Sequence, residues 1–309
     1  MHPIASYPIG FQGRPWGASE VALWRASLHR RRSYADDVLA SVDRLSDRFD
    51  VQPYGEITSG NETHEVMCLR NHNWREDLPL VLVTGGVHGY ETSGVHGALR
   101  FLDEEADAFE GRVNLLVAPC VSPWAYERIQ RWNHDATDPN RSFREQSPAP
   151  ESAALLRLIA PWRGRFAAHI DLHETTDSDE SEFRPAKAAR DGESFEPCNI
   201  PDGFYVVDDT ENPQPAFQQS IIEAVSSVTH IAQADAQGSL IGSPMVAPGV
   251  IRYPLRELGL CTSITEARFT STTEVYPDSP RATPETCNAA QVAAVRAALR
   301  FVLRDRQSK

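Results

Sequence analysis

Two patterns of apolar residues alternate along the 309 residues of this chain. Short apolar runs bounded by turn residues predict strands, and longer stretches with helical spacing predict helices. The predicted strands cover residues 66–69, 80–84, 113–118, 166–172, 204–207 and 260–265, and the predicted helices cover 91–105, 150–162, 216–228 and 284–303. Strands that alternate with helices favour a mainly parallel sheet with helices on its faces.

The last predicted helix, 284–303, has a clear start. Thr283 is placed as its N-cap and Pro284 as its first residue, where a missing backbone N–H costs little. One apolar stripe runs along it, formed by Val292, Val295, Leu299 and Val302.

Residues 174–203 interrupt this alternation, since they hold few aliphatic and many charged side chains. Between Asp171 and Glu196 there are nine acidic and three basic residues. Long loops in compact domains are often functional, so this acidic loop is expected to be either a lid that faces the substrate or a solvated loop. As a lid at the entrance it would favour basic substrates.

Composition and charge narrow the class of protein. The length fits one large α/β domain or two smaller ones, and we expect a single domain over residues 1–309 with the acidic loop as an insertion. The net charge of −13 disfavours binding to nucleic acid or to an anionic membrane surface. No segment approaches the ~20 apolar residues of a membrane helix. The oligomeric state is left open.

The cysteines and the N-terminus bear on the compartment. Five widely spaced cysteines without a CxxC pair favour a reducing environment over a disulfide framework. Residues 1–5 show no basic start followed by an apolar run, so no secretory signal is visible. We therefore expect a cytoplasmic protein.

Candidate metal ligands follow the predicted strand 80–84. His88 and Glu91 lie three residues apart where this strand gives way to a helix, so both side chains can point at one spot. A chance meeting of the two residue types is the alternative. His173 follows the predicted strand 166–172, and ligands bind at the C-terminal edge of such sheets. Two histidines and one glutamate would leave a zinc ion one open position, as in catalytic zinc sites.

Two further residues share the face of His173 by the alternation of a strand. Asp171 is expected to support His173 or to line the site. His169 is expected to be a core or lining residue rather than a ligand.

Other residues suit the substrate and the proton transfer. Arg141, after Asn140, suits a substrate carboxylate, although an Asp-Pro-Asn turn with a surface arginine is the simpler reading. Glu266 ends the predicted strand 260–265 and is preferred as the general base. Glu274 is the rival candidate.

The ordered motifs resemble those of the zinc metallocarboxypeptidases, the carboxypeptidase A-like group that also contains aspartoacylase and succinylglutamate desuccinylase. The resemblance spans roughly residues 80 to 300. Its motifs are Gly-Gly-Val-His88-Gly-Tyr-Glu91, Arg131-Trp-Asn, Asp138-Pro-Asn140-Arg141-Ser-Phe, Asp171-Leu-His173-Glu and Ile264-Thr-Glu266.

The resemblance implies a three-layer α/β/α fold with a mixed, mainly parallel central sheet. It implies one Zn²⁺ ion bound by His88, Glu91 and His173. Asn140 and Arg141 would hold a terminal carboxylate, and Arg131 would stabilise the oxyanion. The residues assigned by resemblance thus complete a hydrolytic site.

The chain departs from the family pattern at Pro139, where the family usually has leucine or a similar residue. Tyr253 is the nearest candidate for the mobile tyrosine of the peptidases, at a shorter separation from the base than usual, and a tyrosine in a strand or at the rim is the alternative. The spacing from Glu91 to His173 is closer to that of the compact acylases.

The leading hypothesis is therefore a zinc metallocarboxypeptidase that acts on small peptides, cleaving an amide next to a free carboxylate. The alternatives are an N-acyl amino acid deacylase and a non-catalytic zinc- or peptide-binding module.

Overall fold

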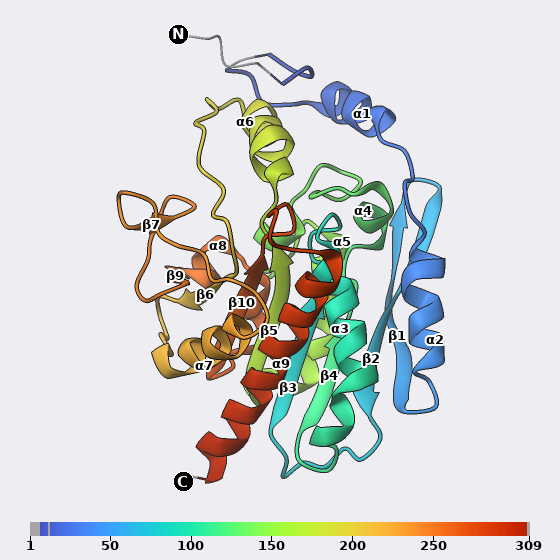
Figure 1. Cartoon of the computed structure of the whole chain (residues 1–309). Coiled ribbons are helices and arrows are strands. Elements are labelled where there is room, and N and C mark those ends of the chain that lie inside the picture. The colour runs from blue at the N-terminus through green and yellow to red at the C-terminus, as the bar shows by residue number, and fades with distance from the viewer. Residues whose placement is uncertain (1–6, 12, 308–309) are drawn as a thin grey trace.

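An eight-stranded mixed sheet forms the centre of the computed structural model (Figure 1), with strand order β1-β2-β4-β3-β5-β10-β6-β9. The structure describes residues 7–11 and 13–307, so the N-terminal residues used above to judge a secretory signal lie outside the described part. The strands of this sheet are β1 (Phe49–Ser59), β2 (Glu62–Asn71), β3 (Leu80–Gly85), β4 (Asn114–Ala118), β5 (Phe166–Glu174), β6 (Tyr205–Asp209), β9 (Val250–Tyr253) and β10 (Phe269–Val275). A separate small hairpin pairs β7 (Ser239–Leu240) with β8 (Ser243–Pro244).

The directions of the strands confirm a mixed, mainly parallel sheet. The pairs β3–β4, β3–β5, β5–β10 and β6–β9 are parallel, and the pairs β1–β2, β2–β4 and β6–β10 are antiparallel. The parallel strands β3, β5 and β10 lie side by side at the centre, so their C-terminal ends meet at one edge.

Helices cover both faces of the sheet. They are α1 (Ala18–Ser27), α2 (Ala40–Arg44), α3 (Thr92–Glu104), α4 (Pro123–Arg128), α5 (Pro150–Ile159), α6 (Arg184–Asp191), α7 (Pro215–Ser226), α8 (Leu255–Leu258) and α9 (Pro284–Gln307). Helices α3, α7 and α9 pack together over one face, as Figure 1 shows, and bury the larger apolar core. Helix α5 packs on the other face over a second core. The expected α/β class is thus confirmed.

Most predicted elements are present within a few residues of their expected bounds. The last helix begins at Pro284, and the Thr283 hydroxyl accepts the backbone N–H of Thr286 at 3.1 Å, as expected of an N-cap. The strand predicted at 260–265 is wrong, because Cys261–Thr265 forms a 3₁₀ helix. Strand β10 follows it instead, and β1, β9 and β10 were not predicted.

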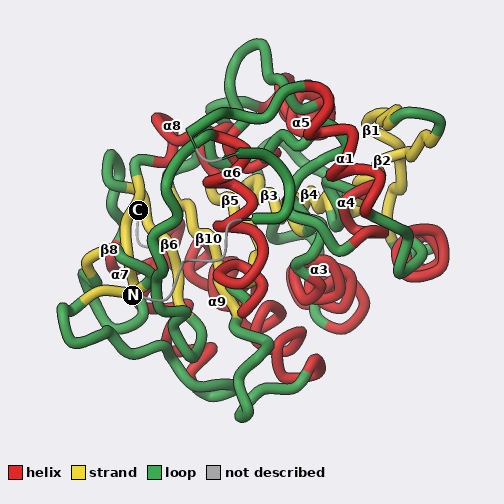
Figure 2. The backbone as a smooth tube through the Cα atoms, turned by 90° about the horizontal axis from the view of Figure 1, so that it is seen from above, coloured by secondary structure: helices red, strands yellow, loops and turns green. Residues whose placement is uncertain are grey.

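Residues 174–203 are not a plain loop. A π-helical turn at Asp179–Phe183 runs into α6, which lies above the end of β5 (Figure 2). The prediction of irregular structure is therefore wrong for 179–191, and this segment brings a helix to the edge of the sheet where the candidate ligands lie.

Two further expectations concern the whole chain. No helix in residues 7–11 and 13–307 combines the length and the apolar character needed to cross a bilayer. All five cysteines are unpaired thiols, and four of them are buried.

Candidate active site

His88 and Glu91 lie in the turn that joins β3 to α3. Gly86 has φ of +58°, a conformation that glycine adopts without strain, and the turn then places Glu91 as the residue that caps α3. His88 is 2% exposed and Glu91 is 1% exposed. Burial of an imidazole and a carboxylate is costly unless each has a polar partner. His88 and Glu91 provide this partner for each other in part.

His173 completes the cluster from the C-terminal end of β5. Its Nδ1 lies 2.6 Å from Glu91 Oε2, and His88 Nδ1 lies 2.7 Å from Glu91 Oε1. One ligand atom from each of the three residues lies within 4.8 Å of the other two. The structure therefore brings together the three residues that the sequence predicted as metal ligands.

The donor set fits a catalytic zinc ion. Glu91 Oε2 is buried and accepts no hydrogen bond in the described part of the chain, despite the nearby imidazole, so it is available to a ligand. Two imidazoles and one carboxylate are a donor set that zinc favours when one position stays open. Burial would raise the pKa of Glu91, but His173 and His88 outweigh it and lower this pKa to about 2, so the carboxylate is ionised.

The other ring nitrogens of both histidines are held by carboxylates. His88 Nε2 lies 3.0 Å from Asp138, and His173 Nε2 lies 2.6 Å from Asp171. Such partners fix the ring orientation of metal-binding histidines. His169 is a buried core residue whose Nε2 contacts the Thr84 hydroxyl at 3.0 Å, as expected.

A second cluster of ligand-type residues has a different explanation. Glu62, His64 and Glu127 also each have a ligand-type atom within 4.8 Å of those of the other two. Arg30 and Arg128, however, pair with both carboxylates. These ion pairs already balance the negative charge, so the cluster is accounted for without a cation.

Arg131 lies beside the metal cluster. Its Nε donates to Asp138 at 3.1 Å, and its Nη1 lies 3.3 Å from the Tyr90 hydroxyl and 3.4 Å from Asp179. Asp138 thus joins Arg131 to His88. The sequence motif contained Asp138, but its bridging role was not predicted, because only the fold brings residues 88 and 131 together.

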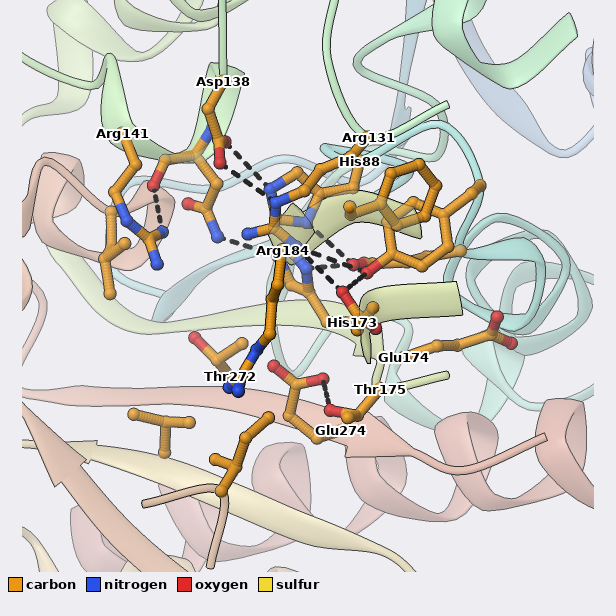
Figure 3. A pocket seen from close by; sticks show the side chains of 18 of the residues that line it. His88, Arg131, Asp138, Arg141, His173, Glu174, Thr175, Arg184, Thr272 and Glu274 are labelled. Carbon is orange, nitrogen blue, oxygen red and sulfur yellow. Dashed lines mark hydrogen bonds and ion pairs between the residues drawn. The ribbon is translucent and has the colours of Figure 1, made fainter. Parts of the chain in front are cut away.

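Asn140 and Arg141 line the same cavity, in which Figure 3 shows Arg141. The Cys261 backbone N–H donates to Asn140 Oδ1 at 2.8 Å, which orients the amide with Nδ2 3.4 Å from His173. Pro139 opens the short 3₁₀ turn here, and the Asp138 side chain caps it, so the departure from the family pattern costs no needed backbone donor.

Glu266 does not join the other predicted residues. It follows the 3₁₀ helix Cys261–Thr265 in a left-handed conformation, and it pairs with Arg163 at 3.2 Å while its side chain stays 44% exposed. The expectation that Glu266 ends a buried strand at the sheet edge is wrong, because no strand precedes it. Glu266 is absent from the lining of the cavity among the described residues.

Glu274, the rival base, faces the cavity from β10. It is the register partner of His173 on the neighbouring strand, and its Oε2 accepts a hydrogen bond from the Thr175 hydroxyl at 2.8 Å. Burial and the nearby Glu91 raise the pKa of Glu274 to about 8. A carboxyl group with a pKa near neutrality is suited to taking up and returning a proton.

Strand β9 and the segment 174–203 contribute further lining residues. Tyr253, the candidate for the mobile tyrosine, lines the cavity from the last position of β9. The segment contributes side chains of both signs: Glu174, Thr175, Asp179, Phe183, Arg184 and Lys187. Its acidic members are satisfied internally, since Glu174 accepts two backbone N–H groups of α3 and Asp179 accepts from Tyr90 and Thr176. The segment therefore faces the cavity with acidic and basic side chains together.

Comparisons with known proteins agree with this geometry. The family model for the succinylglutamate desuccinylase/aspartoacylase catalytic domain matches residues 77–193. Comparison with curated protein sequences finds no significant match.

Solved structures show the same fold at low sequence identity. A protein from Shewanella amazonensis described as a "putative metallopeptidase" aligns with a TM-score of 0.62 at 20% identity, over 85% of this chain and 90% of that one. The carboxypeptidase A from Helicoverpa armigera aligns with a TM-score of 0.58 at 14% identity, over 94% of this chain and 74% of that one. A metallo-carboxypeptidase from Pseudomonas aeruginosa aligns with a TM-score of 0.57 at 15% identity, over 94% and 70%.

The chain thus has a carboxypeptidase-like α/β fold. The resemblance to the zinc carboxypeptidase group, including its desuccinylase and aspartoacylase branch, is confirmed by the match over residues 77–193 and by the shared fold.

Proposed function

We propose that this chain is a zinc-dependent hydrolase that cleaves an amide bond next to a free carboxylate. The observation that carries the proposal is the meeting of two groups in one cavity. The buried cluster of His88, Glu91 and His173 lies there, and Glu274 is paired in register with His173. A binding module has no use for a carboxyl group with a raised pKa beside its metal ligands, so the pairing favours catalysis.

The free carboxylate of the substrate is assigned to Arg141. Burial lowers the pKa of its guanidinium although the charges of Asp138 and Glu274 oppose this, and no carboxylate in residues 7–11 and 13–307 forms a direct ion pair with it. Its polar contact is the backbone oxygen of Asn140, at 2.7 Å. A partly buried cation without a direct ion pair is costly, so a substrate carboxylate would supply that pair. The Asn140 amide would add a second donor.

The chemistry divides between the metal and the chain. Zinc, when bound, would lower the pKa of water to about 7 and polarise the substrate carbonyl. Glu274 would take the proton from the attacking water and return it to the leaving nitrogen. Arg131 would stabilise the charge that develops on the carbonyl oxygen, because Asp138 and Asp179 hold its guanidinium in place beside the cavity.

The size of the cavity favours a small substrate. Its volume is about 210 Å³, below the range usual for drug-sized ligands. We favour a short peptide, cleaved as by a carboxypeptidase. An N-acyl amino acid is the second candidate, and the match of residues 77–193 to the desuccinylase and aspartoacylase model favours it.

The test measures metal content and hydrolysis in the same preparation. The zinc-loaded protein is assayed on short peptides and N-acyl amino acids, each in a matched pair with a free and an amidated C-terminal carboxylate. We expect about one zinc ion per chain and hydrolysis of the free forms. Equal cleavage of the amidated forms would contradict the assignment of Arg141, and bound zinc without hydrolysis of any substrate would favour a binding module.

A further inference from the structure

Gln291, on α9, is a fully buried polar residue outside the cavity lining. Both amide protons of Gln291 are donated in hydrogen bonds. Its Nε2 donates to the backbone oxygen of His173 at 2.9 Å and to the Ser93 hydroxyl at 3.4 Å. Its Oε1 accepts the Thr273 hydroxyl at 2.6 Å. One side chain thus ties α9 to β5, α3 and β10.

Each partner of Gln291 adjoins a residue of the proposed active site. The carbonyl group belongs to the ligand His173 itself, and Ser93 lies two residues after the ligand Glu91. Thr273 directly precedes the proposed base Glu274. Because neighbouring residues of a strand point to opposite faces, Glu274 faces the cavity while Thr273 faces α9.

The approach of α3 to α9 makes these contacts possible. A Cβ atom on Gly97 of α3 would lie 2.4 Å from Cβ of Gln291, closer than real Cβ atoms come. Glycine at this position therefore lets α9 come near enough for the amide to reach both strands. Figure 1 shows α3 and α9 side by side in front of the sheet.

We infer that Gln291 is a positioning residue that sets the place of the metal ligands relative to the base. This inference rests on the proposed function. The amide fixes the backbone of His173 and the hydroxyl beside Glu274 at the same time, so it holds the two strands that carry ligand and base in one register from behind the sheet. Without it, β5, β10 and the start of α3 would lose their common anchor.

A second buried glutamine provides a matched control. Gln218 on α7 is also fully buried, and it accepts the Ser271 hydroxyl at 2.8 Å. Its Nε2 donates to Asp208 at 3.0 Å and to the backbone oxygen of Thr270 at 2.7 Å. Gln218 thus forms as many hydrogen bonds as Gln291 and also anchors β10, but none of its bonds reaches a metal ligand.

The experiment compares Gln291→Leu with Gln218→Leu in the full chain. Thermal unfolding is measured first, and we expect both variants to lose stability to a similar degree. Zinc affinity by chelator competition and kcat are then measured below both transitions. We expect Gln291→Leu to weaken zinc binding about tenfold and to lower kcat about tenfold, with KM little changed. Gln218→Leu should keep both values at the wild-type level.

A smaller change guards against failure of Gln291→Leu to fold. Thr273→Val removes the hydroxyl that Gln291 accepts, and Thr273→Ser retains it. We expect the valine variant to lower kcat and the serine variant to restore it. Equal effects of the two glutamine substitutions on zinc affinity and kcat, or equal effects of the two threonine substitutions on kcat, would overturn the inference. A wild-type protein that binds no zinc would instead contradict the proposed function.

Discussion

Glu274 and His173 are register partners on the adjacent parallel strands β10 and β5. The pairing presents a carboxyl group and an imidazole side by side at the edge of the sheet. A slip of one residue would turn Glu274 to the opposite face, so the register of this strand pair decides whether the site has a base.

Substitution of Glu274 tests this assignment directly. Glu274→Gln keeps the size of the side chain and removes its ability to accept a proton, so we expect kcat to fall by about 10²–10⁴-fold with zinc retained. Glu266→Gln is the control, because Glu266 pairs with Arg163 outside the cavity and should leave kcat unchanged. A loss of activity in Glu266→Gln alone would restore the sequence-based choice.

Substitution of two histidines of β5 distinguishes a proposed metal ligand from a histidine that is only buried. His169 and His173 are both buried and lie on the same face of the strand. We expect His173→Ala to lose zinc during dialysis, because one of three ligands is gone, whereas His169→Ala retains it. Metal analysis after dialysis checks this, and the thermal transition of both variants shows how much either change costs in stability. Retention of zinc by His173→Ala would contradict the ligand set.

Arg141 is expected to act on binding more than on chemistry. Removing the guanidinium in Arg141→Ala should raise KM for substrates with a free carboxylate by about 10–100-fold, since a charge-assisted hydrogen bond contributes about 1.5–3 kcal/mol. The ratio of kcat/KM between free and amidated substrates measures the effect. Arg184→Ala is the comparison, because Arg184 lines the same cavity but already pairs with Glu180 at 3.5 Å.

Thr175 is expected to tune the proton transfer. Its hydroxyl donates to Glu274 and lowers the pKa of that carboxyl group, which burial raises to about 8. Glu274 must be ionised to act as a base, so the rate should rise as the pH passes through its pKa, which bound zinc would itself draw downward. Thr175→Val removes the donor and should move the acid limb of kcat/KM to higher pH. Thr175→Ser should leave the limb in place, and identical profiles for the two variants would contradict this role.

The buried Glu151 is expected to make the free energy of unfolding depend on pH, independently of catalysis. Burial raises its pKa from 4.5 to about 7, although Asn133 donates to it at 3.2 Å. The folded state therefore keeps a proton that the unfolded chain releases, and stability falls as the pH rises from about 4.5 to about 7. Glu151→Gln removes this dependence. It should be more stable than the wild type at pH 8, by at most about 3 kcal/mol, and nearly equal at pH 5. Denaturant unfolding at both pH values measures the difference.

The hydrophobic pattern determined most of the central sheet. The apolar runs of β3 and β5 are buried on both faces, so composition alone marks them as strands. Strand β10 was missed because it is built from threonine and serine, and a buried strand of this kind lacks an apolar signal. Two of its hydroxyl groups are buried at low cost because glutamines on the covering helices bind them: Gln218 binds Ser271, and Gln291 binds Thr273.

The sequence by itself determined the predicted metal ligands, because local geometry decides their placement. His88 and Glu91 are fixed by one turn, and His173 by the end of a strand, so their spacing carries the information. Only the tertiary structure favours Glu274 over Glu266 as the proposed base. The choice between Glu266 and Glu274 depends on which segment joins the sheet, and that depends on side chains of α7 and α9 that are distant in sequence. The polar strand β10 is stabilised by those contacts. Its own residues therefore could not identify it as a buried strand.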